Sequence, residues 1–408
     1  MERNGSRWQP VRVVPPEEIA YRLGRLKQQL AERDLDAALV VQRVDLFYFT
    51  GTAQDAHLYI PREGEPLLMV RRDVNRALAE SPLAQDRIIP LQSLRRLPAI
   101  IEEAGLPLPR RLGVEMDVLP ASQFLRYQEI LAAEMVDISP TIRRLRAVKS
   151  PLEIRTLEAA AQKHDAFLAY IPKVLAEGRT EAEVAAELER FARQQGHLGP
   201  IRFRAFNQEM FHGSLLSGDS GGVPSSYDTP LGGPGLYPSY PREMGYKRLM
   251  PGEPIMADYV GHYGGYMVDA SRVYVLGDPG RLPEKLKKAH RLALAIEEAV
   301  IAAARPGITG GELYDLARQM ACEAGLAEHF QGYGSQVPFV GHGVGLEIDE
   351  LPVLAAGHRE PLEEGMVIAV EPKFVFPGWG AVGLEDTGIV TSQGLRLLTQ
   401  FPREIQAV

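Results

Sequence analysis

The chain has 408 residues, a net charge of −8, 45% hydrophobic and 24% charged residues, and a single cysteine. This length suits two domains, and the lack of a basic segment argues against a nucleic-acid partner. Charged residues interrupt the long apolar windows and the N-terminus has no signal-like run, so we expect no membrane partner and a cytoplasmic location. Cys322 excludes an internal disulfide, and its apolar helical surroundings predict a buried thiol.

The first part of the chain is expected to form a small α/β domain. Residues 17–33 show the helical spacing of apolar side chains that marks an amphipathic helix. Short β-like runs follow at residues 37–41, 66–70 and 112–116. Turn residues and helical patterns separate these runs, which is typical of an α/β arrangement.

The boundary between the two domains is expected near Val148. The next residues form a helix start in which Ser150 caps, a proline occupies the first turn and Glu153 closes a capping box. We therefore divide the chain into an N-terminal domain, residues 1–148, and a C-terminal domain, residues 149–408.

The C-terminal domain contains an internal repeat. Capping boxes that begin at Thr180 and Thr309 start amphipathic helices, and these stop at Gly196 and Gly325, at the same spacing in both copies. Each helix is followed by a β-hairpin pattern. Each is also preceded by a further predicted helix, at residues 151–172 and 283–304. The matching order of elements indicates a duplication.

The hairpin of the first copy presents two aspartates. A turn centred on Tyr263 and Gly264 predicts that Asp258 lies directly opposite Asp269. The two carboxylates would then project from one face at a separation of roughly 5 Å. Ser271, two residues beyond the second acid, is expected on the same face, where it could orient the carboxylate.

The hairpin of the second copy presents two glutamates in the same way. A turn centred on Gly378 predicts that Glu371 lies opposite Glu385. Thr387 follows the second acid at the spacing of Ser271 in the first copy. Both copies are thus expected to contribute one opposed carboxylate pair and one hydroxyl.

Acids that face each other on apolar strands need a compensating cation. Arg272 and Lys373 stand nearby, but no basic residue recurs at matching positions of the two hairpins, so a metal is the simplest answer. His342, flanked by glycines, supplies a nitrogen ligand. Four carboxylates and one imidazole suit two divalent metal ions such as Mn, Co, Zn or Fe. The predicted metal ligands are Asp258, Asp269, His342, Glu371 and Glu385.

These segments resemble the pita-bread-fold metallopeptidases, which include methionine aminopeptidase, Xaa-Pro aminopeptidase and Xaa-Pro dipeptidase (prolidase). The matching pieces are Asp269-Ala-Ser-Arg272, Gly341-His342-Gly-Val-Gly-Leu346, Val370-Glu371-Pro372 and Glu385-Asp-Thr387. Asp45–Gly51 and Leu145–Lys149 resemble the creatinase/prolidase N-terminal domain and its junction, so the likeness covers essentially the whole chain. It implies an α/β (α+β) fold, with a creatinase-like N-terminal α/β domain followed by a pseudo-twofold pita-bread catalytic domain.

The resemblance also implies roles for the predicted ligands. Asp258 would bind one ion, His342 and Glu371 the other, and Asp269 and Glu385 would bridge the two. A hydroxide between the metals would cleave the bond before proline in short peptides, with Glu371 resembling the family's proton shuttle. The resemblance further suggests a homodimer.

The chain departs from the family pattern at two positions. Asp349 stands where peptidase members have a histidine seven residues after the metal-binding one, and Pro241 stands where they have a second histidine. Asp349 is then either a new catalytic group or one that supports its neighbours. One alternative function uses the same metals for C–N hydrolysis or elimination on a small molecule. A further alternative is a non-catalytic binding protein.

Candidates for substrate binding come from two segments. The long glycine- and proline-rich segment 218–246 lies where the second family histidine is missing, and its aromatic residues favour an ordered pocket wall. Within it, Tyr240 and Arg242 are expected to contact substrate. His212 is a further candidate.

Overall fold

The computed structural model describes residues 11–408. The residues before Val11, which include most of the N-terminal stretch without a signal-like run, lie outside the described part. The chain divides into two compact units, Met1–Leu145 and Arg146–Val408. Within residues 11–408, none of the helices has the length and apolar character needed to cross a membrane.

The N-terminal unit is built on one mixed six-stranded sheet in the order β4-β3-β2-β1-β5-β6. Its strands are β1 (Ala37–Val40), β2 (Ala56–Pro61), β3 (Leu67–Val70), β4 (Ile88–Pro90), β5 (Arg111–Val114) and β6 (Glu134–Asp137). Its helices are α1 (Pro16–Glu32), α2 (Arg43–Thr50), α3 (Val74–Glu80), α4 (Leu97–Glu103), α5 (Ala121–Leu131) and α6 (Ser139–Ala147), which ends beyond Leu145. Apolar side chains of the sheet, α4 and α5 share one core, which includes Tyr59, Ile101 and Tyr127. The predicted α/β domain is confirmed.

The four principal helices of the C-terminal unit follow the predicted repeat. They are α7 (Pro151–Leu168), α8 (Glu181–Gln194), α9 (Glu284–Ala303) and α10 (Gly310–Glu323). The expected capping boxes are formed at the starts of α7, α8 and α10. One expectation is wrong: Cys322 is exposed, because the buried side of α10 runs through Leu313, Ala317 and Ala321.

Three sheets make up the centre of the C-terminal unit. One has the order β17-β9-β8-β7, one the order β11-β10-β12-β15-β16, and the third is the pair β13-β14. The strands are β7 (Gly213–Ser217), β8 (Ile255–Tyr263), β9 (Tyr266–Val275), β10 (Phe339–Gly343), β11 (Glu350–Ala355), β12 (Val367–Val370), β13 (Lys373–Phe376), β14 (Gly380–Gly383), β15 (Asp386–Thr391), β16 (Gly394–Leu397) and β17 (Gln406–Ala407).

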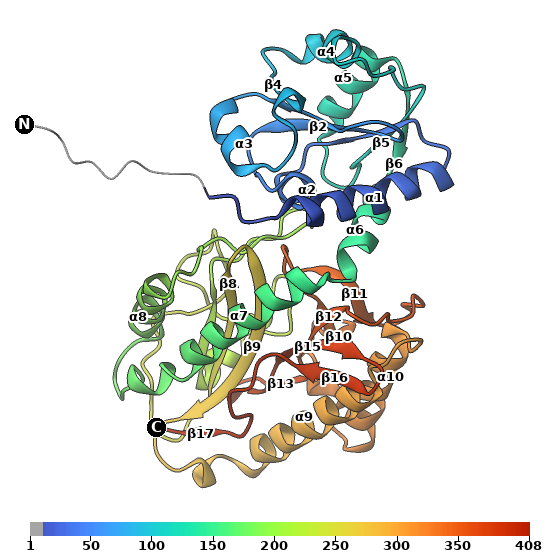
Figure 1. Ribbon diagram of the computed structural model, residues 1–408. Coiled ribbons are helices and arrows are strands. Elements are labelled where there is room, and N and C mark those ends of the chain that lie inside the picture. The colour runs from blue at the N-terminus through green and yellow to red at the C-terminus, as the bar shows by residue number, and fades with distance from the viewer. Residues whose placement is uncertain (1–10) are drawn as a thin grey trace, which may run out of the picture. The chain divides into compact units, whose positions relative to one another are not determined.

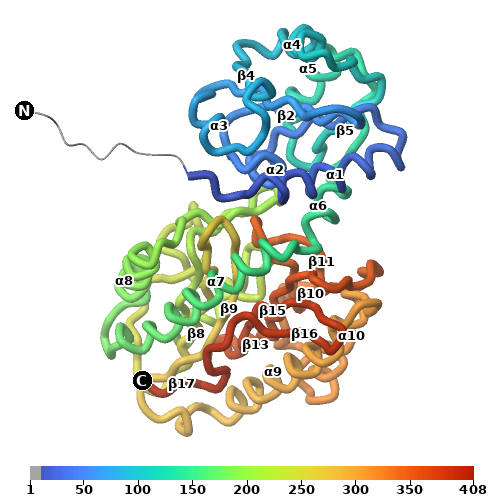
Figure 2. Tube along the Cα trace, in the orientation of Figure 1, coloured from blue at the N-terminus to red at the C-terminus, as the bar shows by residue number. Residues whose placement is uncertain are grey.

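The helices cover these sheets in two groups. Figure 1 shows α7 and α8 against the strands β7, β8 and β9, and α9 and α10 against the strands of the second repeat. Figure 2 follows the chain from β16 back towards the first repeat, where β17 pairs in parallel with β9. The two hairpins with the predicted acids therefore meet inside the unit, with helices outside them.

Candidate metal centre

The first hairpin, β8–β9, differs in register from the prediction. The turn is formed by Gly264 and Gly265, which both have positive φ, so Asp258 lies opposite Ser271 and Asp269 lies opposite Val260. The error is two residues. Because side chains alternate between the faces of a strand, such a shift keeps both acids on the predicted face, as diagonal rather than direct neighbours.

The second hairpin keeps the predicted register on both sides of its acids. Val370 pairs with Asp386 in one sheet, and Lys373 pairs with Gly383 in the next. Glu371 and Glu385 lie between these pairs, at the point where the hairpin passes from β12–β15 into β13–β14. The acids of this hairpin thus lie at the junction of two sheets.

The two hairpins are joined directly beneath their acids. Ser271 and Glu385 form an antiparallel bridge in which each backbone N–H donates to the other's carbonyl at 3.2 Å. The Thr387 hydroxyl accepts from the Asp269 N–H and donates to the Asp269 carbonyl, both at 2.8 Å. The expectation that both hydroxyls orient carboxylates is wrong: Thr387 holds backbone, and the buried Ser271 hydroxyl has no partner among the described residues.

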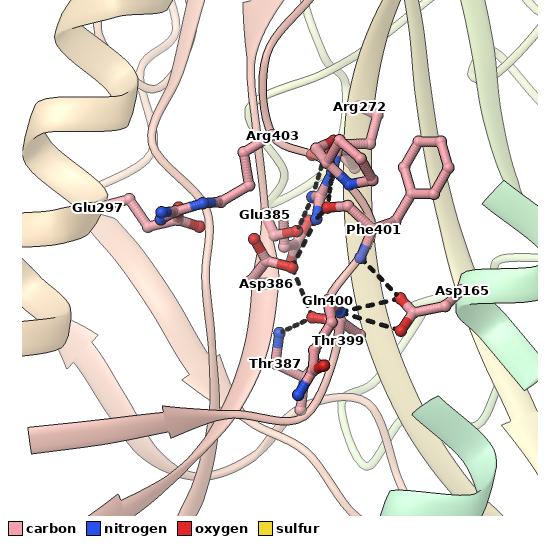
Figure 3. Close-up of polar contacts among 12 residues, drawn as sticks. Asp165, Arg272, Glu297, Glu385, Asp386, Thr387, Thr399, Gln400, Phe401 and Arg403 are labelled. Carbon is pink, nitrogen blue, oxygen red and sulfur yellow. Dashed lines mark hydrogen bonds and ion pairs between the residues drawn. The ribbon is translucent and has the colours of Figure 1, made fainter. Parts of the chain in front are cut away.

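Arg272 stabilises this junction through hydrogen bonds. Its fully buried guanidinium donates to the Glu385 carbonyl at 2.8 Å and to the Asp386 carboxylate at 2.8 Å. It also donates to the Phe401 carbonyl at 2.6 Å, in the segment after β16 (Figure 3). A planar guanidinium can bond several acceptors at once, so Arg272 fixes the backbone that carries Glu385. The sequence had placed it near the acids without this role.

Lys373 is the main site residue that sequence reasoning discounted. Its ammonium donates to Asp258 Oδ2 at 2.9 Å, Glu371 Oε2 at 2.8 Å and Glu385 Oε2 at 2.8 Å. Burial lowers the pKa of Lys373, but these carboxylates raise it well above its ordinary value. Lys373 was set aside because no basic residue recurs at matching positions of both hairpins, yet it offsets part of the acids' charge without a counterpart in the first hairpin. A lysine two residues after a predicted ligand was the available signal, because side chains two residues apart in an extended chain point to the same side.

The remaining ligand atoms form a separate group. Single ligand atoms of Asp269, His342 and Glu385 lie within 4.8 Å of one another. Asp269 Oδ1 and Glu385 Oε1 are buried without a hydrogen-bond partner in the described chain. His342 Nε2 lies 3.8 Å from Glu385 Oε1 and 3.6 Å from Glu371 Oε1. Carboxylate oxygens and an imidazole nitrogen directed to one point suit a divalent transition metal, so these residues fit such an ion.

Electrostatics also favour a cation at this point. Burial and the neighbouring Asp258 raise the pKa of Asp269 well above its ordinary value, although Lys373 lowers it. Burial and Asp269 do the same to Glu385. One lysine therefore does not offset the charge of four acids, and a bound cation would relieve what remains.

Asp349 accepts hydrogen bonds from the backbone. Its carboxylate accepts from the backbone N–H of Arg204 at 2.9 Å. The next residue, Glu350, is buried against Arg146 and Lys149, at 2.5 and 3.0 Å. Although burial raises the pKa of Glu350, these two cations lower it to about 2. Asp349, where the family resemblance predicts that a histidine is replaced, thus accepts a backbone hydrogen bond.

The predicted substrate residues lie in two places. Tyr240 donates to Glu243 Oε1 at 2.6 Å, and Arg242 donates to the Glu209 carbonyl at 2.9 Å. Burial raises the pKa of Glu243, and the charge of Asp258 raises it further. Glu243 is therefore near enough to Asp258 to interact with it electrostatically. Sequence reasoning missed Glu243. Pro241, between the two predicted residues, accepts through its carbonyl from a serine hydroxyl.

His212 faces the helical layer instead. Its ring packs against Phe167, Tyr259 and His197, with ring centroids 5.2, 5.0 and 4.4 Å away. Tyr259 follows Asp258 on β8 and therefore points to the opposite face of the sheet. Burial holds the pKa of His212 well below its ordinary value. This placement speaks against direct contact between His212 and a substrate at the acids.

Comparison with known proteins gives a consistent result. The chain matches the Xaa-Pro dipeptidase of Pyrococcus furiosus with 27% identity over 94% of this chain and 99% of that protein. An uncharacterized peptidase of Bacillus subtilis, YqhT, is 30% identical over 75% of this chain and 76% of its own length. The solved structure of an Xaa-Pro dipeptidase from Bacillus anthracis superposes with a TM-score of 0.81 at 27% identity, covering 96% of this chain and 100% of that one.

Family models agree with these relatives. Residues 22–148 match the Creatinase/Prolidase N-terminal domain. Residues 155–392, more than half of the chain, match Metallopeptidase family M24. Divalent metal ions are implied for this family, and the group formed by Asp269, His342 and Glu385 fits such an ion. The chain therefore belongs to Metallopeptidase family M24 and is a metal-dependent hydrolase with a creatinase/prolidase-type N-terminal domain.

Proposed function

We propose that this protein is a peptidase that cleaves the bond before proline in short peptides, as the names of its relatives suggest. The observation that carries the proposal is the pair of unpartnered oxygens, Asp269 Oδ1 and Glu385 Oε1, beside His342 Nε2. A divalent ion held there, Mn, Co, Zn or Fe, would supply Lewis-acid activation of water and carbonyl. The sequence predicts two ions, and the second predicted position is the one that includes Asp258.

The chain's own residues would divide the remaining work. Glu371 turns one oxygen towards His342 and the other towards Lys373, so it can hold a proton at Oε1 while Oε2 stays fixed. This supports the proton-shuttle role expected for Glu371. Tyr240 and Arg242 would shape the pocket wall through their bonds to Glu243 and Glu209 rather than bind substrate by free polar groups. The homodimer and the cytoplasmic location stay predictions.

A second candidate function keeps the metal site but changes the substrate. Asp349 accepts a hydrogen bond from Arg204, whereas the histidine expected at this position in peptidases can donate one to a substrate or intermediate. An acceptor here would suit a substrate with a cationic or N–H group. Hydrolysis of a non-peptide C–N bond, or elimination from a small zwitterion, is the corresponding proposal.

A panel of Xaa-Pro dipeptides with Mn(II) or Co(II) tests both candidates, with Asp349→His assayed in parallel. Turnover by the parent protein supports the peptidase proposal. Turnover only after the histidine is restored rejects it and favours the second candidate. Inactivity of both proteins on peptides while metal stays bound would leave the second candidate and a binding role, which the same metal-loaded protein can be tested for with small C–N substrates.

A further inference from the structure

The ammonium of Lys373 is bound as a metal ion would be. Its side chain is 1% exposed, and its three N–H groups meet three carboxylates, those of Asp258, Glu371 and Glu385, at 2.8 to 2.9 Å. An ammonium has three donors and no acceptor, so all its hydrogen-bonding capacity is used. The Lys373 ammonium thus has all its hydrogen bonds and its counter-charges from carboxylates of the same chain.

The backbone holds Lys373 in this orientation. Its N–H donates to Gln331 Oε1 at 2.8 Å, and its carbonyl accepts from the Gln331 N–H at 2.8 Å. Gln331 is itself 1% exposed, and its amide donates to the Phe339 carbonyl. Across the strand stands Gly383, where a Cβ would lie 3.1 Å from Lys373 Cγ. The fold therefore leaves space for the lysine stem and clamps its backbone.

The shared carboxylates point in two directions. Glu385 gives Oε2 to Lys373 and leaves Oε1 beside His342. Glu371 likewise gives Oε2 to Lys373 and has Oε1 at 3.6 Å from His342 Nε2. Asp269 Oδ1 has no partner in the described chain. The cluster thus has two adjacent cation positions, of which Lys373 fills the one that includes Asp258.

We propose that the Lys373 ammonium replaces one of two metal ions, so that the protein binds a single divalent ion through Asp269, His342 and Glu385. A second divalent ion at Asp258 would have to displace the ammonium, which would then be buried without its acidic partners and close to a doubly charged ion. Lysine and one divalent ion together offset three of the four negative charges. The Lys373 ammonium thus occupies the position of one of the two predicted metal ions.

The inference rests on the proposed function only in requiring that a metal is bound, and its test does not use a substrate. The full-length protein is stripped with chelator, loaded with Mn(II), desalted and analysed for metal per chain. We expect one ion in the parent and two in Lys373→Ala. The exposed Lys285→Ala variant serves as the matched control and should bind one, as the parent does.

Electron paramagnetic resonance of the same samples gives an independent readout. The parent should show the spectrum of an isolated Mn(II), and Lys373→Ala that of an exchange-coupled pair bridged by shared carboxylates. If Lys373→Ala does not fold, Asp258→Asn decides: it should still retain one ion, because Asp258 bonds the lysine, whereas Asp269→Asn should retain none.

The outcomes separate the two proposals. Two coupled ions in the parent would overturn the single-ion inference and leave the proposed peptidase intact. Loss of the one ion in Asp258→Asn would also overturn it. No retained metal in the parent and in Lys373→Ala would instead overturn the metal-dependent function itself.

Discussion

Two groups of buried carboxylates in the C-terminal unit have opposite charge balance. At the hairpin junction, one lysine bonds Asp258, Glu371 and Glu385 but not Asp269, and the pKa of Asp269 and of Glu385 is raised. At the start of β11, two acids instead meet several cations. The residues of this second group, the arginine–lysine cluster, are Glu347, Glu350, Arg146, Lys149 and Arg204.

The difference shows that burial alone does not mark a metal site. Glu350 is as deeply placed as the junction acids, yet its pKa is lowered to about 2 because Arg146 and Lys149 outweigh the effect of burial. An acid with sufficient cations from its own chain is structural. An excess of acids over cations is what calls for an ion from outside, and of these two groups it is the junction that has that excess.

The largest expected effect follows from removing an unpartnered junction oxygen. Asp269→Asn should abolish metal retention and reduce turnover by more than the roughly 10- to 100-fold that loss of an outer-shell partner costs. Metal analysis and steady-state rates with an Xaa-Pro dipeptide measure both. The exposed Glu364→Gln variant is the control and should match the parent. Full metal occupancy in Asp269→Asn would refute the assignment of this site.

Removing the cation behind the junction tests stability rather than metal binding. Arg272→Met leaves Asp386 buried without its ion-pair partner, at a cost of about 3 to 5 kcal/mol in the free energy of unfolding. Arg396→Met, which breaks the exposed pair with Glu158, should cost at most about 1 kcal/mol. Urea unfolding of both variants measures the contrast. Equal losses would mean that Arg272 contributes no more than a surface residue.

The arginine–lysine cluster predicts a pH dependence of defined sign. The pKa of Glu350 falls from an ordinary 4.5 to about 2 in the folded protein. Its contribution to stability is therefore complete above the ordinary pKa and is lost as pH falls towards 2. It amounts to about 3 kcal/mol at neutral pH. Urea unfolding of the parent and Glu350→Gln should differ clearly at pH 7 and much less at pH 3. A pH-independent difference would contradict the ion-pair origin.

Local signals in the sequence were sufficient for much of this architecture. Capping boxes at Ser150, Thr180 and Thr309 predicted helix starts because capping depends on four neighbouring residues. The first hairpin was misregistered because the turn was centred on Tyr263 and Gly264, whereas Gly264 and Gly265 form it. Asp258 and Asp269 nevertheless lie on the predicted face, because a register error of an even number of residues leaves each side chain on the same face.

The role of Lys373 could not be read from local patterns. A cation at equivalent positions of both repeats would have been visible in the sequence. The basic residues of the two hairpins are not at equivalent positions. Arg272 lies behind the junction and Lys373 within it. Which acids Lys373 reaches is decided where two hairpins, distant in sequence, come together, and no periodicity within one strand contains that information.

The equivalent hydroxyls of the two repeats provide the finest comparison. The Thr387 hydroxyl bonds both the N–H and the carbonyl of Asp269, whereas the buried Ser271 hydroxyl has no partner in the described chain. Thr387→Val should therefore cost about 1 to 3 kcal/mol, because it leaves two buried backbone groups unsatisfied. Ser271→Ala should change stability by less than about 1 kcal/mol in either direction, because it removes no hydrogen bond.

Urea unfolding in the presence of chelator measures these two effects without a contribution from bound metal. The Thr387→Ser variant is the matched control, since it keeps the hydroxyl and should lie nearer the parent than Thr387→Val does. Equal losses of unfolding free energy in Thr387→Val and Ser271→Ala would show that the two hydroxyls contribute equally to stability. A larger loss in Thr387→Val would place the fastening of Asp269 in the second repeat, so that each hairpin holds the acids of the other.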